Sequence, residues 1–179
     1  MTLTTFDENL CQKLEPGVCT TQRRIEVLKE LHKNGIPTIV WLTPILPFIN
    51  DSQENILKIL EECHEAGVKG IICFGMGVTL REGSREYYYK QLDRLFPGMK
   101  EKYQMTYNDQ YTLNSPHNRD LMNLFFKKCQ EYQMMCNYKY YSSKYLLMHL
   151  RSQFIPLFTK FQDAPCHKPP NNIVRHKLI

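Results

Sequence analysis

The 179-residue sequence predicts an α/β fold built from parallel strands. Two continuous apolar runs, residues 36–42 and 68–74, have the composition of strands that are buried on both faces. An amphipathic helical pattern precedes each run. Because the helices and strands alternate with short connections, the crossovers are expected to be right-handed and the strands to pair in parallel.

The first elements are a short strand and a helix. Residues 3–6, Leu-Thr-Thr-Phe, have the β-branched composition of a strand. Thr20 and Thr21 are candidate N-caps for a helix over residues 21–34, in which apolar side chains recur at helical spacing. Gly35 stands in the position where such a helix stops.

The second strand and helix follow directly. After the apolar run 36–42 comes a loop over residues 43–50, and Asp51 is then a good N-cap. Glu54, three residues later, completes the pattern of a capping box. The helix that starts there carries one apolar stripe and ends at Gly67.

The third strand, residues 68–74, is closed by Gly75-Met76-Gly77. In a parallel arrangement the carboxyl ends of all three strands lie on one edge of the sheet. A ligand is therefore expected near Asp7, near residues 43–51 and near residues 75–79. Further helices are predicted over residues 84–96 and 116–134.

A basic tail follows the folded part. Residues 137–179 contain seven basic residues and one acid, so the net charge of +5 belongs to the tail and the preceding body is close to neutral. The domain organisation predicted is a folded part over residues 1–135 and a basic, proline-containing, poorly ordered tail over residues 136–179.

Composition excludes several classes of protein. Apolar residues make up 42% of the chain, charged residues 23%, and mean hydropathy is -0.45, which is typical of a globular chain that does not cross a membrane. No secretory signal is recognisable, so we expect a cytoplasmic protein. The seven cysteines are then expected to be free thiols.

Few residues form a pattern that carries chemistry. The cysteine and histidine spacings match no metal site, and no nucleophile stands in a recognisable elbow, so neither metal ligands nor catalytic residues are assigned. Gly75-x-Gly77 after a strand could allow a ligand to approach the backbone, although a structural turn is the favoured interpretation of so short a motif. The basic and tyrosine-rich segment 81–94 could bind nucleic acid, but interspersed acids favour a solvated helix.

Several segments resemble the radical S-adenosylmethionine superfamily, in particular the C-terminal half of its spore photoproduct lyase-like branch, also labelled DNA repair photolyase. The matching segments, in order, are residues 3–16, 23–31 with 34–37, 44–51, 74–81, and 85–88 followed by 95–98. The resemblance implies the C-terminal half of a partial (β/α)6 barrel of the TIM type, with residues 3–6, 36–42 and 68–74 as its last three strands and with C-terminal helices.

The resemblance also implies a cofactor site at the strand ends. It places eight residues around S-adenosylmethionine: Thr5, Asp7, Pro44, Ile45, Leu46, Gly75, Met76 and Gly77. The first two would lie near the methionine or ribose, the next three would support the adenine, and the last three would let the backbone approach. At the level of the family a four-iron four-sulfur cluster and a DNA substrate are also implied.

The chain departs from the family in one decisive respect. It has no C-x3-C-x2-C loop, the element that holds the cluster with which relatives cleave S-adenosylmethionine to a 5′-deoxyadenosyl radical. We therefore expect a cofactor-supporting half that is inactive by itself, with Met1 an internal methionine of a longer protein. Such a half-barrel would expose a sheet edge able to associate with a partner.

Two other functions remain open. A stand-alone βαβαβ module could hold a nucleotide at residues 75–77 without redox chemistry. A nucleic-acid binder could use the basic tail together with the tyrosine-rich helix.

Overall fold

The computed structural model describes residues 1–136. The prediction of a poorly ordered tail, from residue 137 onward, lies outside the described residues. Every helix within residues 1–136 is too short or too polar to cross a lipid bilayer.

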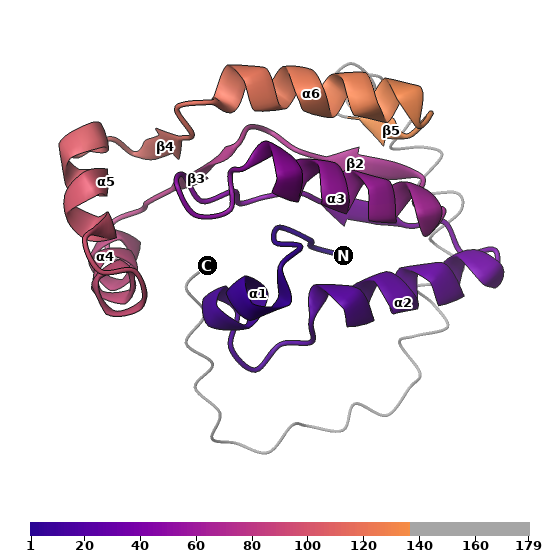
Figure 1. Ribbon diagram of the computed structural model, residues 1–179, viewed down its shortest axis with the longest axis horizontal. Helices are drawn as coiled ribbons and strands as arrows, with labels where there is room; N and C mark the ends of the chain where they lie inside the picture. Colours follow the sequence, from indigo (N-terminus) through magenta and orange to yellow (C-terminus); the bar gives the residue numbers. More distant parts are fainter. Residues whose placement is uncertain (137–179) are drawn as a thin grey trace. The chain divides into compact units, whose positions relative to one another are not determined.

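Three short strands form a parallel sheet in the order β1–β2–β5. Figure 1 shows β5 next to the end of α6. β1 (Ile39–Trp41) pairs with β2 (Gly70–Ile72), and β5 (Met135–Cys136) pairs with the other edge of β2. Near the N-terminus Thr2 adds a single parallel bridge to Trp41. The predicted parallel pairing of the two apolar runs is thus confirmed.

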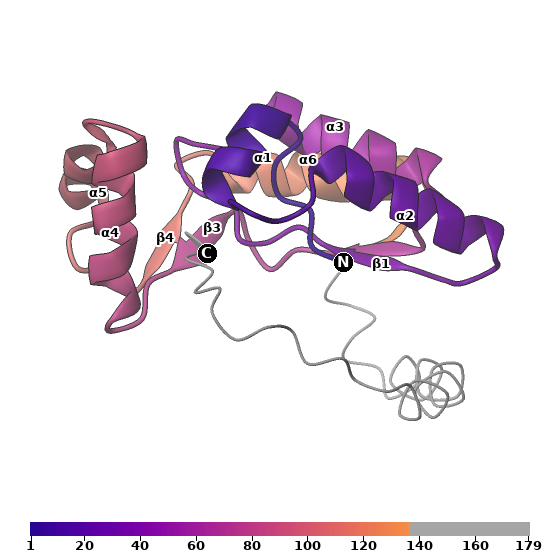
Figure 2. The same cartoon turned by 90° about the horizontal axis from the view of Figure 1, so that it is seen from below.

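Helices α2 (Thr21–Lys33), α3 (Gln53–Glu65) and α6 (Asn118–Glu131) lie on one face of this sheet (Figure 2). Their apolar stripes bury fully against the strands, as the amphipathic patterns predict. The members of this first core include Ile25, Leu28, Val40, Ile56, Ile59, Leu60, Ile71, Leu121 and Phe125. One face of the sheet and the three helices therefore share a single hydrophobic core.

Side-chain caps start the first three helices. Asp7 caps α1 (Glu8–Leu14) by accepting a hydrogen bond from the backbone nitrogen of Leu10 at 2.6 Å, and Thr20 caps α2. The predicted cap at Asp51 is wrong by one residue, because Ser52 caps α3. The carboxylate of Asp51 instead accepts a hydrogen bond from the Ser115 hydroxyl at 2.5 Å.

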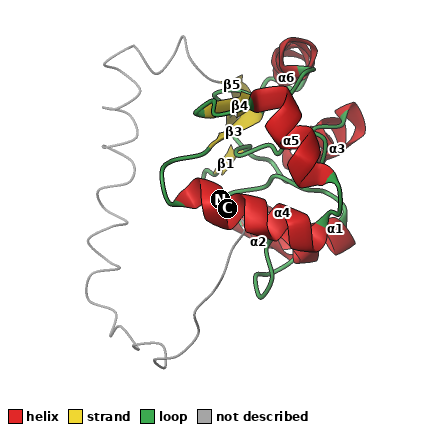
Figure 3. Ribbon diagram, turned by 90° about the vertical axis from the view of Figure 1, so that its left-hand side faces the viewer, coloured by secondary structure: helices red, strands yellow, loops and turns green. Residues whose placement is uncertain are grey.

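A second core lies around a separate antiparallel pair of strands (Figure 3). β3 (Gly77–Thr79) pairs with β4 (Thr112–Asn114), and α4 (Ser84–Leu95) and α5 (Met99–Tyr107) pack with them. Most tyrosines of these helices are buried, and Tyr103 is fully buried. Its hydroxyl donates to the carbonyl of Pro47 at 2.5 Å, which ties α5 to the loop after β1.

The predicted half of a (β/α)6 barrel is wrong. Residues 3–6 form no strand, and the third strand of the parallel sheet comes instead from residues 135–136. After residue 74 the chain leaves the sheet and pairs antiparallel with β4. A barrel needs a continuous ladder of long, tilted strands, whereas strands of two or three residues in two separate sheets supply none.

Candidate functional site

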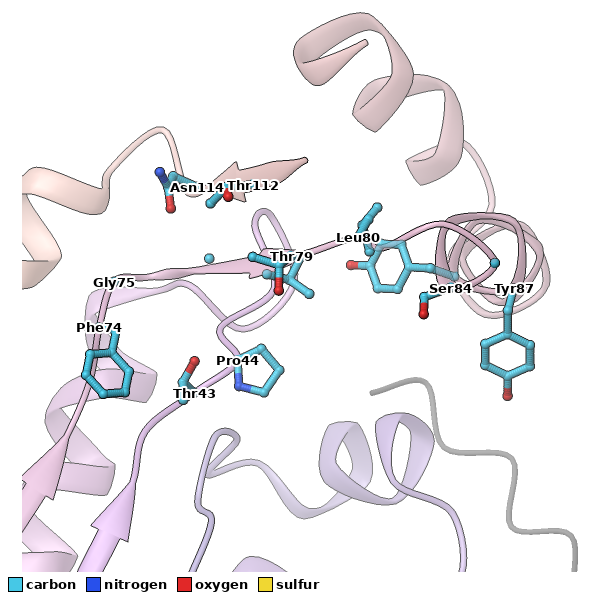
Figure 4. Close-up of a pocket in the computed structure, with 14 residues that line it drawn as sticks. Thr43, Pro44, Phe74, Gly75, Thr79, Leu80, Ser84, Tyr87, Thr112 and Asn114 are labelled. Atoms are coloured by element: carbon cyan, nitrogen blue, oxygen red, sulfur yellow. The ribbon is translucent and has the colours of Figure 1, made fainter. Parts of the chain in front are cut away.

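A pocket of about 700 Å³ lies where the parallel sheet meets the β3–β4 pair. Figure 4 shows Thr43, Pro44 and Phe74 along one side of it and Thr112 and Asn114 along the other. The first three residues follow the carboxyl ends of β1 and β2. Ligands of parallel α/β sheets bind at this end of the strands, so the pocket is the leading candidate site among the described residues.

The β3–β4 pair presents polar side chains to this pocket. Thr79 lies opposite Thr112, and Asn114 lies opposite Gly77, and all four residues line the pocket. Leu113, the middle residue of β4, points the other way and is fully buried in the second core. The strand alternation therefore separates a polar, pocket-facing surface from an apolar, core-facing one.

The start of α4 closes the third side, through Ser84, Tyr87 and Tyr88. The Tyr88 hydroxyl donates to that of Tyr103 at 3.1 Å. Burial raises the pKa of Tyr88 and of Tyr103 well above its usual value, so both phenols stay neutral. The residues that line the pocket then include no charged side chain at neutral pH.

Hydrogen bonds hold the loop between β2 and β3 in place. The backbone nitrogen of Met76 donates to the side-chain oxygen of Asn118 at 2.7 Å, and its carbonyl accepts from the backbone nitrogen of Ser115 at 2.7 Å. Gly75 has a φ of 153°, which side chains of L-residues rarely adopt. The loop thus forms part of the pocket wall. Its conformation is stabilised by the hydrogen bonds of Met76 and requires glycine at position 75.

The second glycine of Gly75-x-Gly77 is required for packing. A Cβ atom at Gly77 would lie 2.6 Å from the carbonyl oxygen of Leu113 and 2.7 Å from the side-chain oxygen of Asn114. The close approach of β3 to β4 therefore needs glycine here. This observation supplies a structural reason for the motif beside any role in ligand binding.

The structure brings only some of the predicted site residues together. Pro44, Gly75 and Gly77 line the pocket described above. Ile45 and Met76 are fully buried in the first core, close in sequence to the pocket but turned into the protein interior.

Leu46 is also fully buried, but in the second core. Its backbone nitrogen donates to the side-chain oxygen of Asn50 at 2.6 Å. The same Asn50 donates to the carbonyl of Thr4 at 3.0 Å and to the hydroxyl of Thr5 at 3.1 Å. Thr5 is buried, so this network holds residues 4–5 against the loop after β1.

Asp7 lies in a different place. It lines a second pocket of about 780 Å³, between α1 and α3, together with Glu8, Glu54 and Lys58. Its carboxylate is already engaged as the cap of α1. Asp7 and Pro44 therefore do not share a pocket in this structure.

No metal site is formed by the described residues. Residues 1–136 contain no group of three or more histidine, cysteine, aspartate or glutamate side chains that could hold a metal ion. Burial raises the pKa of Cys63 from 9.0 to about 12 and that of Cys73 from 9.0 to about 11. These thiols are accordingly protonated and unreactive at neutral pH.

Most of the residues that line the pocket are absent from the predicted site, among them Phe74, Thr112 and Asn114. Phe74 is 67% exposed, although its place at the end of an apolar run predicts a buried side chain. The polar-apolar-polar sequence Thr112-Leu113-Asn114 is a two-residue alternation that could have indicated a strand with one polar face.

Comparison with known proteins finds distant relatives. An uncharacterized protein of Mycobacterium tuberculosis and one of Mycobacterium bovis are each 28% identical to the chain over 107 residues, 60% of this chain and 31% of the relative. An uncharacterized protein of Methanocaldococcus jannaschii is 35% identical over 51 residues, 28% of this chain and 20% of the relative. No family model and no solved structure matches the chain. The chain thus matches less than a third of the length of each of these relatives.

Proposed function

We propose that this chain holds the adenosine part of S-adenosylmethionine in the pocket where the parallel sheet meets the β3–β4 pair, as one portion of a longer protein of the radical S-adenosylmethionine type. The proposal joins the sequence resemblance to one structural observation. That observation is a pocket at the strand ends with a polar strand face, an exposed aromatic ring and no charged side chain.

Each part of the pocket suits a nucleoside. The hydroxyls of Thr79 and Thr112 can exchange hydrogen bonds with a ribose, because a hydroxyl both donates and accepts. The ring of Phe74 is 67% exposed and available for stacking with a base. Trp41 supports this ring from the side in an edge-to-face contact, with centroids 5.8 Å apart.

The uncharged lining limits what this chain can hold. The amino and carboxylate groups of S-adenosylmethionine would find no ion-pair partner here. We therefore assign only the nucleoside part to residues 1–136 and leave the methionine part to segments of the longer protein. A pocket of about 700 Å³ is large enough for a ligand of this size.

An iron–sulfur cluster does not fit the described residues. Such clusters are held by cysteine thiolates, and residues 1–136 bring no three metal-ligating side chains of this kind together. In proteins of the proposed type the cofactor supplies a radical after reductive cleavage. We assign no step of that chemistry to this chain.

The main competing function is a stand-alone nucleotide-binding module. A phosphate group gains most from arginine or lysine side chains, and none lines the pocket. Under our proposal ATP should bind no more tightly than adenosine, whereas a nucleotide-binding module should bind ATP more tightly. The two functions are therefore separated by one comparison of ligands.

The test is calorimetric titration of the full chain with S-adenosylmethionine, adenosine and ATP. We expect adenosine and S-adenosylmethionine to bind with similar affinity and ATP to bind no more tightly. Replacing Phe74 by alanine should weaken adenosine roughly 5- to 100-fold, the range for loss of one aromatic stack. Phe126→Ala is the matched control, because Phe126 is an exposed phenylalanine on α6 outside the pocket.

Absence of binding by all three ligands would refute the proposal. Tighter binding of ATP would favour the nucleotide-binding module. Equal affinity of the Phe74→Ala and Phe126→Ala variants for adenosine would show that the ligand binds elsewhere on the chain.

A further inference from the structure

Asn114 brings a carboxamide side chain to the lining of the pocket. It ends β4, directly opposite Gly77 of β3, and lies on the face of this pair that lines the pocket. Figure 4 shows its carboxamide beside Thr112, across the pocket from Phe74. A base stacked on Phe74 would therefore present an edge toward Asn114.

The missing side chain of Gly77 makes room for this carboxamide. A Cβ atom at Gly77 would lie 2.7 Å from the Asn114 side-chain oxygen, and one at Gly75 would lie 3.9 Å from it. The carboxamide thus rests over the glycine loop at the wall of the pocket. A Cβ atom at Gly77 would occupy that space, whereas one at Gly75 would make only an ordinary contact with the oxygen.

The backbone at Asn114 is anchored while its side chain is available. The carbonyl oxygen of Asn114 accepts a hydrogen bond from the Tyr107 hydroxyl at 2.6 Å. Within residues 1–136 its carboxamide makes no hydrogen bond. The group can therefore pair with a ligand without breaking a contact of the fold in this part of the chain.

A carboxamide offers one donor and one acceptor side by side, and the other polar side chains that line this pocket are hydroxyls. Adenine presents the matching pair on its N6/N7 edge, an amino donor next to a ring-nitrogen acceptor. Guanine and hypoxanthine present two acceptors on the same edge, O6 and N7, which one carboxamide cannot satisfy together. The group therefore discriminates between purines through its fixed pattern of donor and acceptor.

We infer that Asn114 is the specificity-determining residue of this pocket and selects adenine by pairing with its N6/N7 edge. The inference rests on the proposed function, because it needs a nucleoside in the pocket. It adds a residue from β4, a segment that contains none of the predicted site residues, and it gives the pocket a preference for adenosine over inosine and guanosine.

The first experiment uses the unaltered chain and three nucleosides. Titration with adenosine, inosine and 7-deazaadenosine should show adenosine bound most tightly, with a loss of roughly 5- to 100-fold for each analogue. Inosine removes the N6 donor, and 7-deazaadenosine removes the N7 acceptor while keeping the ring for stacking. This comparison does not depend on the folding of any variant.

The second experiment changes the residue itself. Asn114→Asp offers acceptors only, so it should weaken adenosine and remove the advantage of adenosine over 7-deazaadenosine. Asn114→Val keeps a residue favourable in strands but offers neither a donor nor an acceptor, so it should likewise bind the two ligands equally. Asn123→Asp is the matched control, because Asn123 lies exposed on α6 outside the pocket.

The outcomes separate the two proposals. If the unaltered chain binds none of the nucleosides, the proposed function fails. If it binds adenosine and 7-deazaadenosine equally, or if the Asn114 variants keep a preference for adenosine, only the role of Asn114 is overturned. A preference that is lost in both Asn114 variants and kept in Asn123→Asp supports the inference.

Discussion

Replacement of Gly77 by alanine probes the contact that joins β3 to β4. The added Cβ would lie 2.6 Å from the carbonyl oxygen of Leu113 and 2.9 Å from the Cα atom of Asn114. Favourable contacts between carbon atoms lie at about 3.5–4.0 Å, so the strands must separate by roughly 0.5–1 Å. Both atoms belong to the backbone, so rotation of a side chain cannot relieve the clash.

The expected loss of stability is about 1–3 kcal/mol, the usual range for overpacking of a closely packed site. Relaxation is hindered because Leu113 is fully buried in the second core and Tyr107 holds the carbonyl of Asn114 at 2.6 Å. Displacement of β4 also moves Asn114 within the pocket. We therefore expect weaker adenosine binding together with the loss of stability.

The assay is equilibrium unfolding of the full chain in urea, followed by circular dichroism, with adenosine titration of the folded variant. Gly17→Ala is the control, because a Cβ atom there would meet nothing within 4 Å and strain arises only from its φ of 73°. It should lower stability by about 1–2 kcal/mol and leave adenosine affinity unchanged. A Gly77→Ala variant within about 0.5 kcal/mol of the unaltered chain, the usual span of neutral surface changes, would refute the close contact.

Three further changes test the rest of the architecture. Asn50→Leu should lower the free energy of unfolding in urea by about 3 kcal/mol, because three buried hydrogen bonds lose a partner; a loss under about 1 kcal/mol would contradict this. Tyr103→Phe should lower it by about 1–3 kcal/mol, since its hydroxyl links Tyr88 to Pro47, and an unchanged midpoint would show that water replaces these bonds. Burial raises the pKa of Cys73 from 9.0 to about 11, so the protonated thiol stabilises the folded state below pH 9 and this contribution is lost as the pH rises through 11. Unfolding measured between pH 8 and 11 should show a smaller decline for Cys73→Ala, and equal declines would assign the effect to other groups.

The predicted helices agree with the structure because their signals are local. The pattern over residues 21–34 corresponds to α2, and that over 84–96 to α4, each within one residue at either end. A cap and an apolar stripe lie within a few turns of chain, so distant contacts need not be known. The start of α3 is the exception. Asp51 does not cap this helix, and its carboxylate accepts a hydrogen bond from Ser115, which lies far away in the sequence.

The candidate site was predicted only in part. Pro44, Gly75 and Gly77 line the pocket because they follow parallel strands whose pairing the apolar runs predicted. Thr112 and Asn114 reach it through pairing with β3, about 35 positions away in sequence. A strand of three residues has too short an alternating pattern to predict which strand it pairs with.

Local patterning in the sequence by itself determined where α2, α3, α4 and α6 form and that β1 and β2 pair in parallel, because caps, apolar periods and short crossovers act over neighbouring residues. Only the tertiary structure decided that the chain leaves the sheet after residue 74, that β5 takes the place beside β2, and that Asn114 faces the pocket. These choices depend on which distant backbone groups pair and which side chains share a core. Each such contact contributes little free energy by itself, so these contacts become stable only together, when the whole chain packs.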